Sequence, residues 1–270
     1  MKILFSFFLI VVFEQSKAQE LFAYTEPASN MAAKSIGVRL NNYLMKQRYT
    51  SKYNYQLQPE MMWGMSKKVM IHAEGFLSNQ SNTFKFEGGS LFIKYRFYSQ
   101  DEVHSHFRMA AYTRAAFNNG FITQPAINLA GNNSGYEAGV IATKLMNKLA
   151  LSANASFLHA TDNSAGNKFT YGDKNRNAIG YAFSVGQLVL PGQYKNYKQT
   201  NLNAMLEVLG QTNLNSSRSY VDLAPSIQFI FLSKMRLDLG YKFALLNDLE
   251  RSAVTGFLLR FEYNFFNVYK

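Results

Sequence analysis

The chain has 270 residues, no cysteine, and 28 basic against 17 acidic residues, which gives a net charge of +11. The lack of cysteine excludes disulfides and a lipoprotein anchor thiol, so hydrogen bonding and packing must supply the stability. The Lys and Arg residues are scattered along the chain, which argues against nucleic-acid binding and favours a basic interior or contact with anionic lipid headgroups.

The N-terminus carries the pattern of a secretion signal. Lys2 supplies the positive charge, residues 3–13 are almost wholly apolar, and residues 16–18 form a small-x-small cleavage site. The apolar run is too short for a transmembrane helix, which needs roughly 20 residues. We therefore expect residues 1–18 to be removed as a signal peptide and residues 19–270 to form a single barrel domain.

The mature sequence alternates between apolar and polar residues along most of its length. Successive side chains of a strand point to opposite faces, so this alternation predicts strands with one apolar and one polar side. About twelve such segments suit tilted membrane-spanning strands, which need about 9–11 residues in the membrane. They are expected at 33–46, 53–64, 68–79, 84–98, 106–118, 135–146, 148–159, 178–190, 199–212, 219–232, 235–246 and 253–269. Segment 178–190 is the weakest, because either of its faces suits lipid.

The last segment shows the alternation most plainly. Apolar or aromatic side chains stand at the odd positions from Phe257 to Phe265, and Arg260, Glu262 and Asn264 stand between them. This pattern is typical of a strand in an outer-membrane β-barrel, with lipid on one side and a polar lumen on the other. Since lipid tolerates no open sheet edge, we expect this strand to pair with the first one.

The connections give a second, independent signal. Three short turns containing Lys fall at 65–68, 146–148 and 232–235, and two long Asn- and Gly-rich connections fall at 118–135 and 161–177. With the N-terminus in the periplasm, all three short turns are periplasmic and both long loops are extracellular, as in outer-membrane barrels. We therefore predict an all-β fold, a transmembrane antiparallel up-and-down β-barrel of about 12 strands. A soluble β-sandwich is the alternative.

Charged residues within these strands are expected to face the lumen. An Arg or Lys facing lipid costs about 2–4 kcal/mol near the bilayer midplane. Two interpretations stay open: a pore lined by a basic-leaning field, or a network of salt bridges that fills a closed barrel. The expected lumen-lining residues are His72, Glu74, Lys94, Arg96, Arg108, Arg114, Lys144, Asp222, Arg236, Asp238, Lys242, Arg260 and Glu262.

Three stretches, 26–31, 194–202 and 220–231, resemble those of an uncharacterised family of outer-membrane β-barrel proteins of Bacteroidota type. The secretion signal and the aromatic last strand agree with this resemblance. It implies a barrel in the bacterial outer membrane, surrounded by outer-membrane lipid and inserted by the barrel assembly machinery, without a defined substrate or catalytic residue. Barrels of this kind commonly end on an aromatic residue, whereas here Lys270 follows Tyr269.

Few residues are candidates for chemistry. His104 and His106 suit a metal ion, but no further ligands are identifiable. Met61 and Met62 point to opposite faces of a strand, which disfavours a Cu(I) site. His159 lacks the His-x-Ser-Asn-Gly spacing of the outer-membrane phospholipases, and a nucleophile needs its base within hydrogen-bond reach. We predict no catalytic residue, no metal site and no cofactor.

The sequence thus favours a non-enzymatic, porin-like channel or passive transporter for small polar or anionic solutes. The alternative is a non-conducting structural or adhesion barrel whose extracellular loops bind a partner. A lipid-modifying barrel enzyme is a third and less favoured hypothesis.

Overall fold

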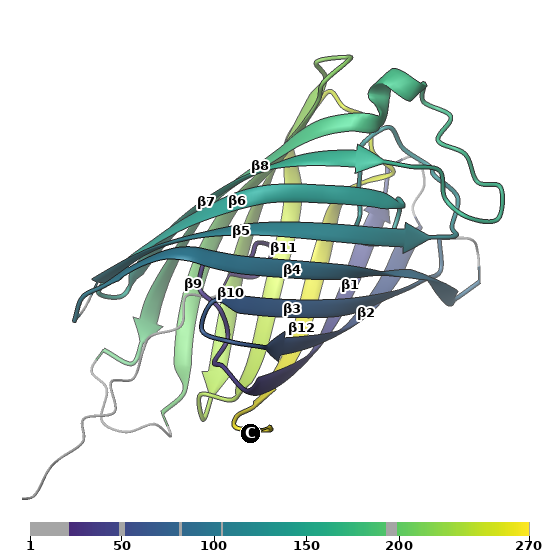
Figure 1. The fold of residues 1–270 in the computed structure, drawn as a ribbon. Helices are drawn as coiled ribbons and strands as arrows, with labels where there is room; N and C mark the ends of the chain where they lie inside the picture. The colour runs from purple at the N-terminus through teal and green to yellow at the C-terminus, as the bar shows by residue number, and fades with distance from the viewer. Residues whose placement is uncertain (1–21, 49–51, 81–82, 104, 193–198, 270) are drawn as a thin grey trace, which may run out of the picture.

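Twelve antiparallel strands form a closed barrel in the computed structural model, which describes residues 22–48, 52–80, 83–103, 105–192 and 199–269 (Figure 1). The expected signal peptide, residues 1–18, lies outside the described residues. A short 3-10 helix, η1 (Asp173–Arg176), precedes β8. The strands are β1 (Ser35–Gln47), β2 (Tyr53–Gly64), β3 (Val69–Ser78), β4 (Lys85–Asp101), β5 (Ser105–Asn118), β6 (Gly135–Met146), β7 (Leu149–Ala160), β8 (Asn177–Leu190), β9 (Asn201–Asn213), β10 (Ser219–Phe231), β11 (Met235–Asn247) and β12 (Ala253–Phe265).

The predicted fold class is confirmed, and the strand bounds agree closely with those expected. The main differences are at β4 and β12. A bulge between Arg96 and Tyr98 lets β4 stay paired with β5 as far as Asp101, beyond the expected end. β12 ends early, at Phe265, because the chain then turns and the Val268 N–H donates to the Lys34 carbonyl oxygen at 2.9 Å.

The barrel closes where the alternation predicted that it would. β12 pairs with β1 from Ile36 opposite Phe265 to Gln47 opposite Ala253. Every strand therefore has a partner on both sides, and the ladder hydrogen bonds run around the whole ring. This closure satisfies the backbone without water, which a strand in hydrocarbon requires.

Burial follows the alternation along each strand. In β12, Phe257 and Phe261 are 55% and 49% exposed, whereas Leu258, Arg260 and Glu262 are 2%, 6% and 6% exposed. The odd positions thus face outward and the even ones face the lumen. An inward position is not always polar, since Leu258 is buried against an apolar cluster described below.

The structure settles the ambiguous strand β8. Tyr181 and Phe183 are exposed on its outer side, and Ser184 and Gly186 are buried on its inner side. The Tyr181 ring lies across Gly210 of β9, where a Cβ placed on the glycine would meet the ring at 2.1 Å. An aromatic face covering a neighbouring glycine keeps this part of the outer surface continuous.

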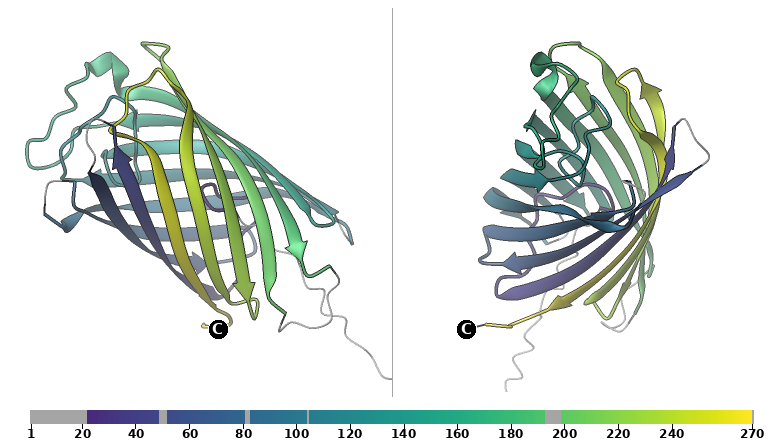
Figure 2. Two further views of the ribbon diagram at one scale, coloured as in Figure 1. Left: turned by 180° about the vertical axis from the view of Figure 1, so that it is seen from behind. Right: turned by 90° about the vertical axis from the view of Figure 1, so that its right-hand side faces the viewer.

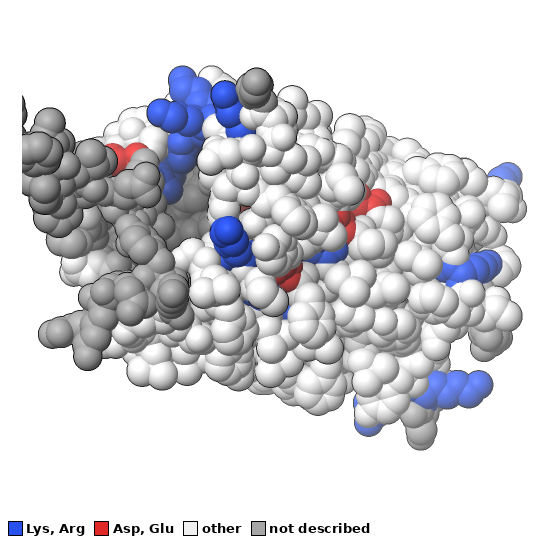
Figure 3. Space-filling view, turned by 90° about the horizontal axis from the view of Figure 1, so that it is seen from below, with Lys and Arg blue, Asp and Glu red and all other residues white. Residues whose placement is uncertain are grey.

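The outer surface of the barrel is largely apolar. Most of the face in Figure 3 carries neither acidic nor basic side chains. Exposed Leu40, Leu91, Ile93, Phe183 and Leu206 stand on five positions of β1, β4, β8 and β9 that point away from the lumen. A contiguous outward apolar surface around closed strands is the feature that lets a barrel span a bilayer. Across the described ranges, no helix has the length and apolar character to cross a membrane.

The connections divide between the two ends as expected. The three turns with Lys lie at the end where the chain terminates, and the long loops after β5 and β7 lie at the other end (Figure 1). Between β10 and β11, Leu232 and Ser233 both have positive φ, at 52° and 55°. Two consecutive left-handed residues are typical of a type I′ hairpin turn. We take the short-turn end as periplasmic.

Candidate functional site in the barrel lumen

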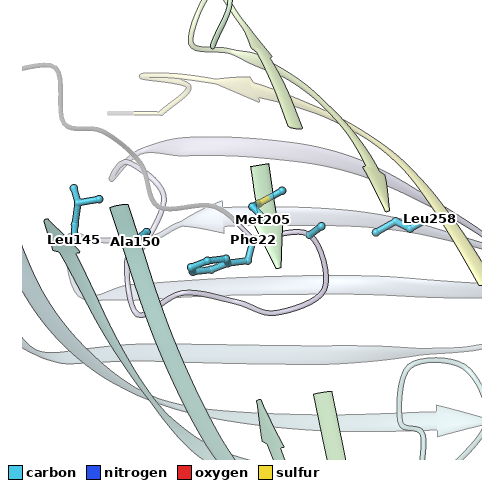
Figure 4. Close-up of a cluster of buried hydrophobic side chains, with 6 residues drawn as sticks. Phe22, Leu145, Ala150, Met205 and Leu258 are labelled. Carbon is cyan, nitrogen blue, oxygen red and sulfur yellow. The ribbon is translucent and has the colours of Figure 1, made fainter. Parts of the chain in front are cut away.

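The residues before β1 lie inside the barrel. This lumen segment, residues 22–34, runs within the ring of strands (Figure 2). Phe22, at 1% exposure, packs against inward side chains of four strands, namely Leu145, Ala150, Met205 and Leu258 (Figure 4). The segment has no alternating pattern, so nothing in the sequence marks it as a lumen segment.

One buried carboxylate of the wall binds the start of the lumen segment. Glu207 accepts hydrogen bonds from the backbone N–H groups of Ala23, Tyr24 and Thr25, each at 2.9 Å. The Thr25 hydroxyl also donates to Glu207, at 2.7 Å, and lies 2.8 Å from Ser184 Oγ. Since hydrogen bonds to a carboxylate are strong, β9 and β8 hold this stretch firmly.

Cations of the wall bind the middle of the segment. Lys94 donates to the carbonyl oxygens of Pro27 and Ser29 at 2.7 and 2.9 Å, and lies 3.4 Å from the Glu26 carboxylate. Arg39 pairs with Glu26 at 3.0 Å. The Glu26 carboxylate and the two carbonyl oxygens of the lumen segment therefore pair with basic side chains of β1 and β4 that would otherwise face an open lumen.

The long loop after β5 also turns into the barrel. This inward loop, residues 119–134, is fixed to β9 because Gln211 both accepts the Ile127 N–H and donates to its carbonyl oxygen, at 2.8 Å each. Gln58 of β2 donates to the Ala130 carbonyl oxygen at 2.9 Å. The loop thus spans the lumen from β9 to β2 at the extracellular end.

Ion pairs connect the remaining charges of the inner wall. The Arg39 guanidinium lies 3.1 Å from Glu60 and 2.8 Å from Glu262. Asp238 accepts from Arg236 at 2.7 Å and lies 3.5 Å from Arg260. This network corresponds to the structural alternative left open by the sequence, in which lumen charges pair across neighbouring strands.

A second ion-pair group gives a stability prediction. Asp222, at 0% exposure, accepts from both terminal nitrogens of Arg251, at 2.6 and 2.7 Å, and lies 3.5 Å from Lys242. Asp222→Ala leaves the buried Arg251 guanidinium without its carboxylate partner, so we expect a loss of about 3–5 kcal/mol in the free energy of unfolding. Urea unfolding of the detergent-folded barrel measures it. Asp162→Ala, in a loop ion pair with Arg176, is the control with a far smaller change.

The structure places most of the expected lumen residues on inward positions of their strands. His72, for example, has its Nδ1 against Glu60, and Arg108 donates to Ser29 Oγ at 2.8 Å. Arg96 lies at the periplasmic rim, where it donates to the Lys67 carbonyl oxygen. The residues on inward positions are His72, Glu74, Lys94, Arg96, Arg108, Arg114, Asp222, Arg236, Asp238, Lys242, Arg260 and Glu262.

Lys144 differs from that set. In β6, buried Ile141, Thr143 and Leu145 are the inward positions, so Lys144 stands on the outer face, opposite Phe107 of β5. It lies two residues from the end of β6. The long aliphatic stem of a Lys near a strand end lets its ammonium group reach the lipid headgroups. Lys144 therefore avoids the cost of a charge in the hydrocarbon, which was the reason to expect it in the lumen.

The inner face is not basic-leaning, because it carries several acids that are not among the expected lumen-lining residues. Glu26 belongs to the lumen segment, Glu207 binds that segment, and Glu60 and Glu137 pair with Arg39 and Arg114. Each stands on an inward position or in the lumen, so acids and bases nearly balance there. Strand parity alone identifies Glu60, Glu137 and Glu207, since they alternate with outward apolar residues.

A polar cavity of about 290 Å³ separates the lumen segment from the inward loop. Its wall includes Tyr112 and Arg114 of β5 and Asn154 and Ser156 of β7. Tyr24 to Glu26 close it on one side, and residues 127–130 of the inward loop close it on another. The lumen is thus obstructed by two segments outside the wall, with space between them.

The other candidates for chemistry gain little support. His104 lies outside the described residues, and within the described ranges no three His, Asp or Glu side chains gather as a metal site. Met61 is exposed and Met62 is buried, on opposite faces as expected. His159 Nδ1 lies 2.7 Å from the Asn177 amide oxygen and its ring stacks on Tyr136.

The extracellular loop after β7 has its own ion pair. Asp162 accepts from the Phe169 N–H at 2.9 Å and from Arg176 at 2.7 Å. These two hydrogen bonds, first that of the backbone and then that of the guanidinium, lower the pKa of the Asp162 carboxyl. The loop therefore keeps this anchor under mildly acidic conditions.

The fold is similar to that of solved outer-membrane channels. No protein-family model matches the chain, and no curated protein matches it. Among solved structures, an outer-membrane channel from Pseudomonas putida F1 is similar at a TM-score of 0.56 and 14% identity, over 89% of this chain and 100% of that one. The NanC porin is similar at a TM-score of 0.50 and 12% identity, over 86% of this chain and 98% of that one.

The KdgM porin is also similar, at a TM-score of 0.50 and 7% identity, over 85% of this chain and 99% of that one. These identities are low, so the likeness concerns the fold. The protein has the fold of outer-membrane, porin-like 12-strand barrels.

Proposed function

We propose that the protein is a porin-like channel of the bacterial outer membrane that passes small polar solutes, and that the lumen segment controls its opening. The observation that carries the proposal is the content of the lumen. Its obstructions are two segments outside the wall, held by polar contacts, with a polar cavity of about 290 Å³ between them. A closed barrel with a polar interior provides the path once the lumen segment moves.

The balance of charge changes the expected selectivity. With the lumen segment in place, Glu26 pairs with Arg39 and Lys94, so no unpaired basic field faces a solute there. The proposal is therefore a channel for small polar solutes, with a preference for anions only after the segment and its carboxylate have left the lumen.

Single-channel recording of the refolded protein in planar bilayers tests the proposal. We expect discrete current steps with a low open probability, because the lumen segment must leave the lumen before ions pass. If neither the full mature chain nor a chain lacking the lumen segment shows current steps, the channel proposal fails. That result favours the non-conducting barrel with partner-binding extracellular loops, for which the filled lumen is the supporting observation.

The remaining expectations belong to the same proposal. We infer a non-enzymatic role, since His159, the candidate for hydrolase chemistry, has an amide as its hydrogen-bond partner. Three predictions from the sequence remain: contact with outer-membrane lipid, insertion by the barrel assembly machinery, and membership of a family of Bacteroidota type. The lipid contact is checked by whether the protein is extracted only with detergent. The insertion route is checked by whether membrane insertion is lost when the assembly machinery is depleted.

A further inference from the structure

The cavity between the lumen segment and the inward loop has room for a small organic solute. Its volume of about 290 Å³ equals that of roughly ten waters at the ~30 Å³ each occupies in the liquid. The space exists because inward side chains of the wall are small there, with Ser156 on β7 and Gly180 and Ala182 on β8. A Cβ on Gly180 would lie 2.8 Å from Ser156 Oγ, so a larger residue does not fit without movement.

Two polar side chains of the wall line the cavity and can hydrogen-bond to a ligand. Arg114 is held loosely, since its carboxylate neighbours, Glu74 and Glu137, lie at 3.6 and 3.9 Å and its Nε makes no hydrogen bond to the described residues. The Asn154 side chain of β7 is also part of the lining. An amide supplies both donors and an acceptor, so these two side chains can pair with hydroxyl groups of a ligand.

Aromatic rings stand beside these polar groups. The rings of Phe92 and Tyr112 lie 5.2 Å apart, and the Arg114 guanidinium lies 5.5 Å from the centre of the Phe92 ring. Tyr220 lines the cavity as well. Apolar ring faces combined with a few convergent polar groups are typical of sites that orient a small molecule.

The charges around the cavity select a neutral ligand over an anion. Arg114 stands between Glu74 and Glu137, and Glu26 is paired with Arg39. Lys94 also lies near Glu26. The surroundings thus have no excess of positive charge, and an added anion or cation would gain little by entering.

We infer that this cavity is a binding site for a neutral, hydroxylated solute of monosaccharide size. The hydroxyl groups pair with Arg114 and Asn154, and the C–H face of the ring packs on the aromatic side chains. The inference rests on the proposed function in that the bound solute is one that passes along the lumen.

Titration calorimetry of the refolded full mature protein in detergent tests the site, with D-glucose, D-galactose and D-mannose as neutral probes. D-Glucuronate and D-glucosamine serve as charged probes of similar size. At least one neutral sugar is expected to bind more tightly than both charged probes. Binding of none of the three neutral sugars overturns the inference, and so does tighter binding of either charged probe.

Two variants locate the binding. Asn154→Leu removes an amide that lines the cavity, and Ala182→Leu fills the cavity. Each is expected to weaken neutral-sugar binding by at least about tenfold, which corresponds to about 1.4 kcal/mol. Ala153→Leu, on the exposed outer face of β7, and Arg96→Gln, at the periplasmic rim, are the matched controls and should bind as the parent does. Parent-like binding by both cavity variants overturns the site.

The outcome separates this inference from the channel proposal. Sugar binding without current steps supports the binding site and contradicts the channel function. Current steps without neutral-sugar binding contradict the binding site and support the channel function.

Discussion

Deleting the lumen segment is expected to raise the single-channel conductance several-fold. A chain that begins at residue 35 lacks the Glu26 carboxylate and the Pro27 and Ser29 carbonyl oxygens that Lys94 now contacts. It also lacks Phe22, which fills the space among inward side chains of β6, β7, β9 and β12. With that volume open, current no longer depends on movement of the segment.

The same deletion is expected to shift the reversal potential toward anion preference. Without the segment, Lys94 loses the carbonyl oxygens of Pro27 and Ser29, and Arg108 loses the hydroxyl oxygen of Ser29. Arg39 keeps Glu60 and Glu262 but loses Glu26. The Glu26 carboxylate has left beside Lys94 and Arg39, whereas Lys34, which is deleted with it, is exposed, so the field inside the lumen becomes more positive.

A chain that begins at residue 22 is the matched control, because it keeps every described contact of the lumen segment. Circular dichroism and heat-modifiable gel migration establish that the deleted protein still forms a barrel. A folded barrel whose conductance equals that of the control contradicts the prediction. In that case the segment does not limit the current, and the inward loop becomes the obstruction to remove.

The wall could be predicted from the sequence because alternation is a local property. In β11 and β12 each residue's face follows from its neighbours two positions away, and Arg236, Asp238 and Arg260 are buried on the inner side. Lys144 lies on the outer face instead, because its place near the end of β6 relaxes the rule that charges avoid lipid.

The content of the lumen could not be predicted in the same way. The lumen segment is fixed by contacts with residues far along the chain, such as Glu207, which lies 184 positions from Ala23. No periodicity marks such a contact. Gln211, which fixes the inward loop, is likewise 84 positions from Ile127. The charge balance depends partly on the same kind of contact, since Glu26 lies in that segment, whereas strand parity places Glu60, Glu137 and Glu207 on the inner wall.

Locking the lumen segment to the wall is expected to abolish the current steps. The hydroxyl oxygens of Thr25 and Ser184 lie 2.8 Å apart, in the segment and in β8. The chain has no cysteine, so Thr25→Cys with Ser184→Cys introduces the only thiols. Side chains this close suit a disulfide, whose S–S bond is about 2.05 Å. Oxidation then holds the segment in the lumen, and a reductant added to the same bilayer should restore the steps.

Two kinds of control isolate the effect of the lock. Each single cysteine variant should respond to neither oxidant nor reductant. Thr212→Cys with Ser219→Cys joins β9 to β10 at an equally short hydroxyl contact, 2.8 Å, and leaves the segment free, so its current should be unchanged on oxidation. If the oxidised lock conducts as the reduced form does, ions pass around the segment. The cavity and the space beside the inward loop then form a permanent path, because the disulfide keeps the segment in the lumen.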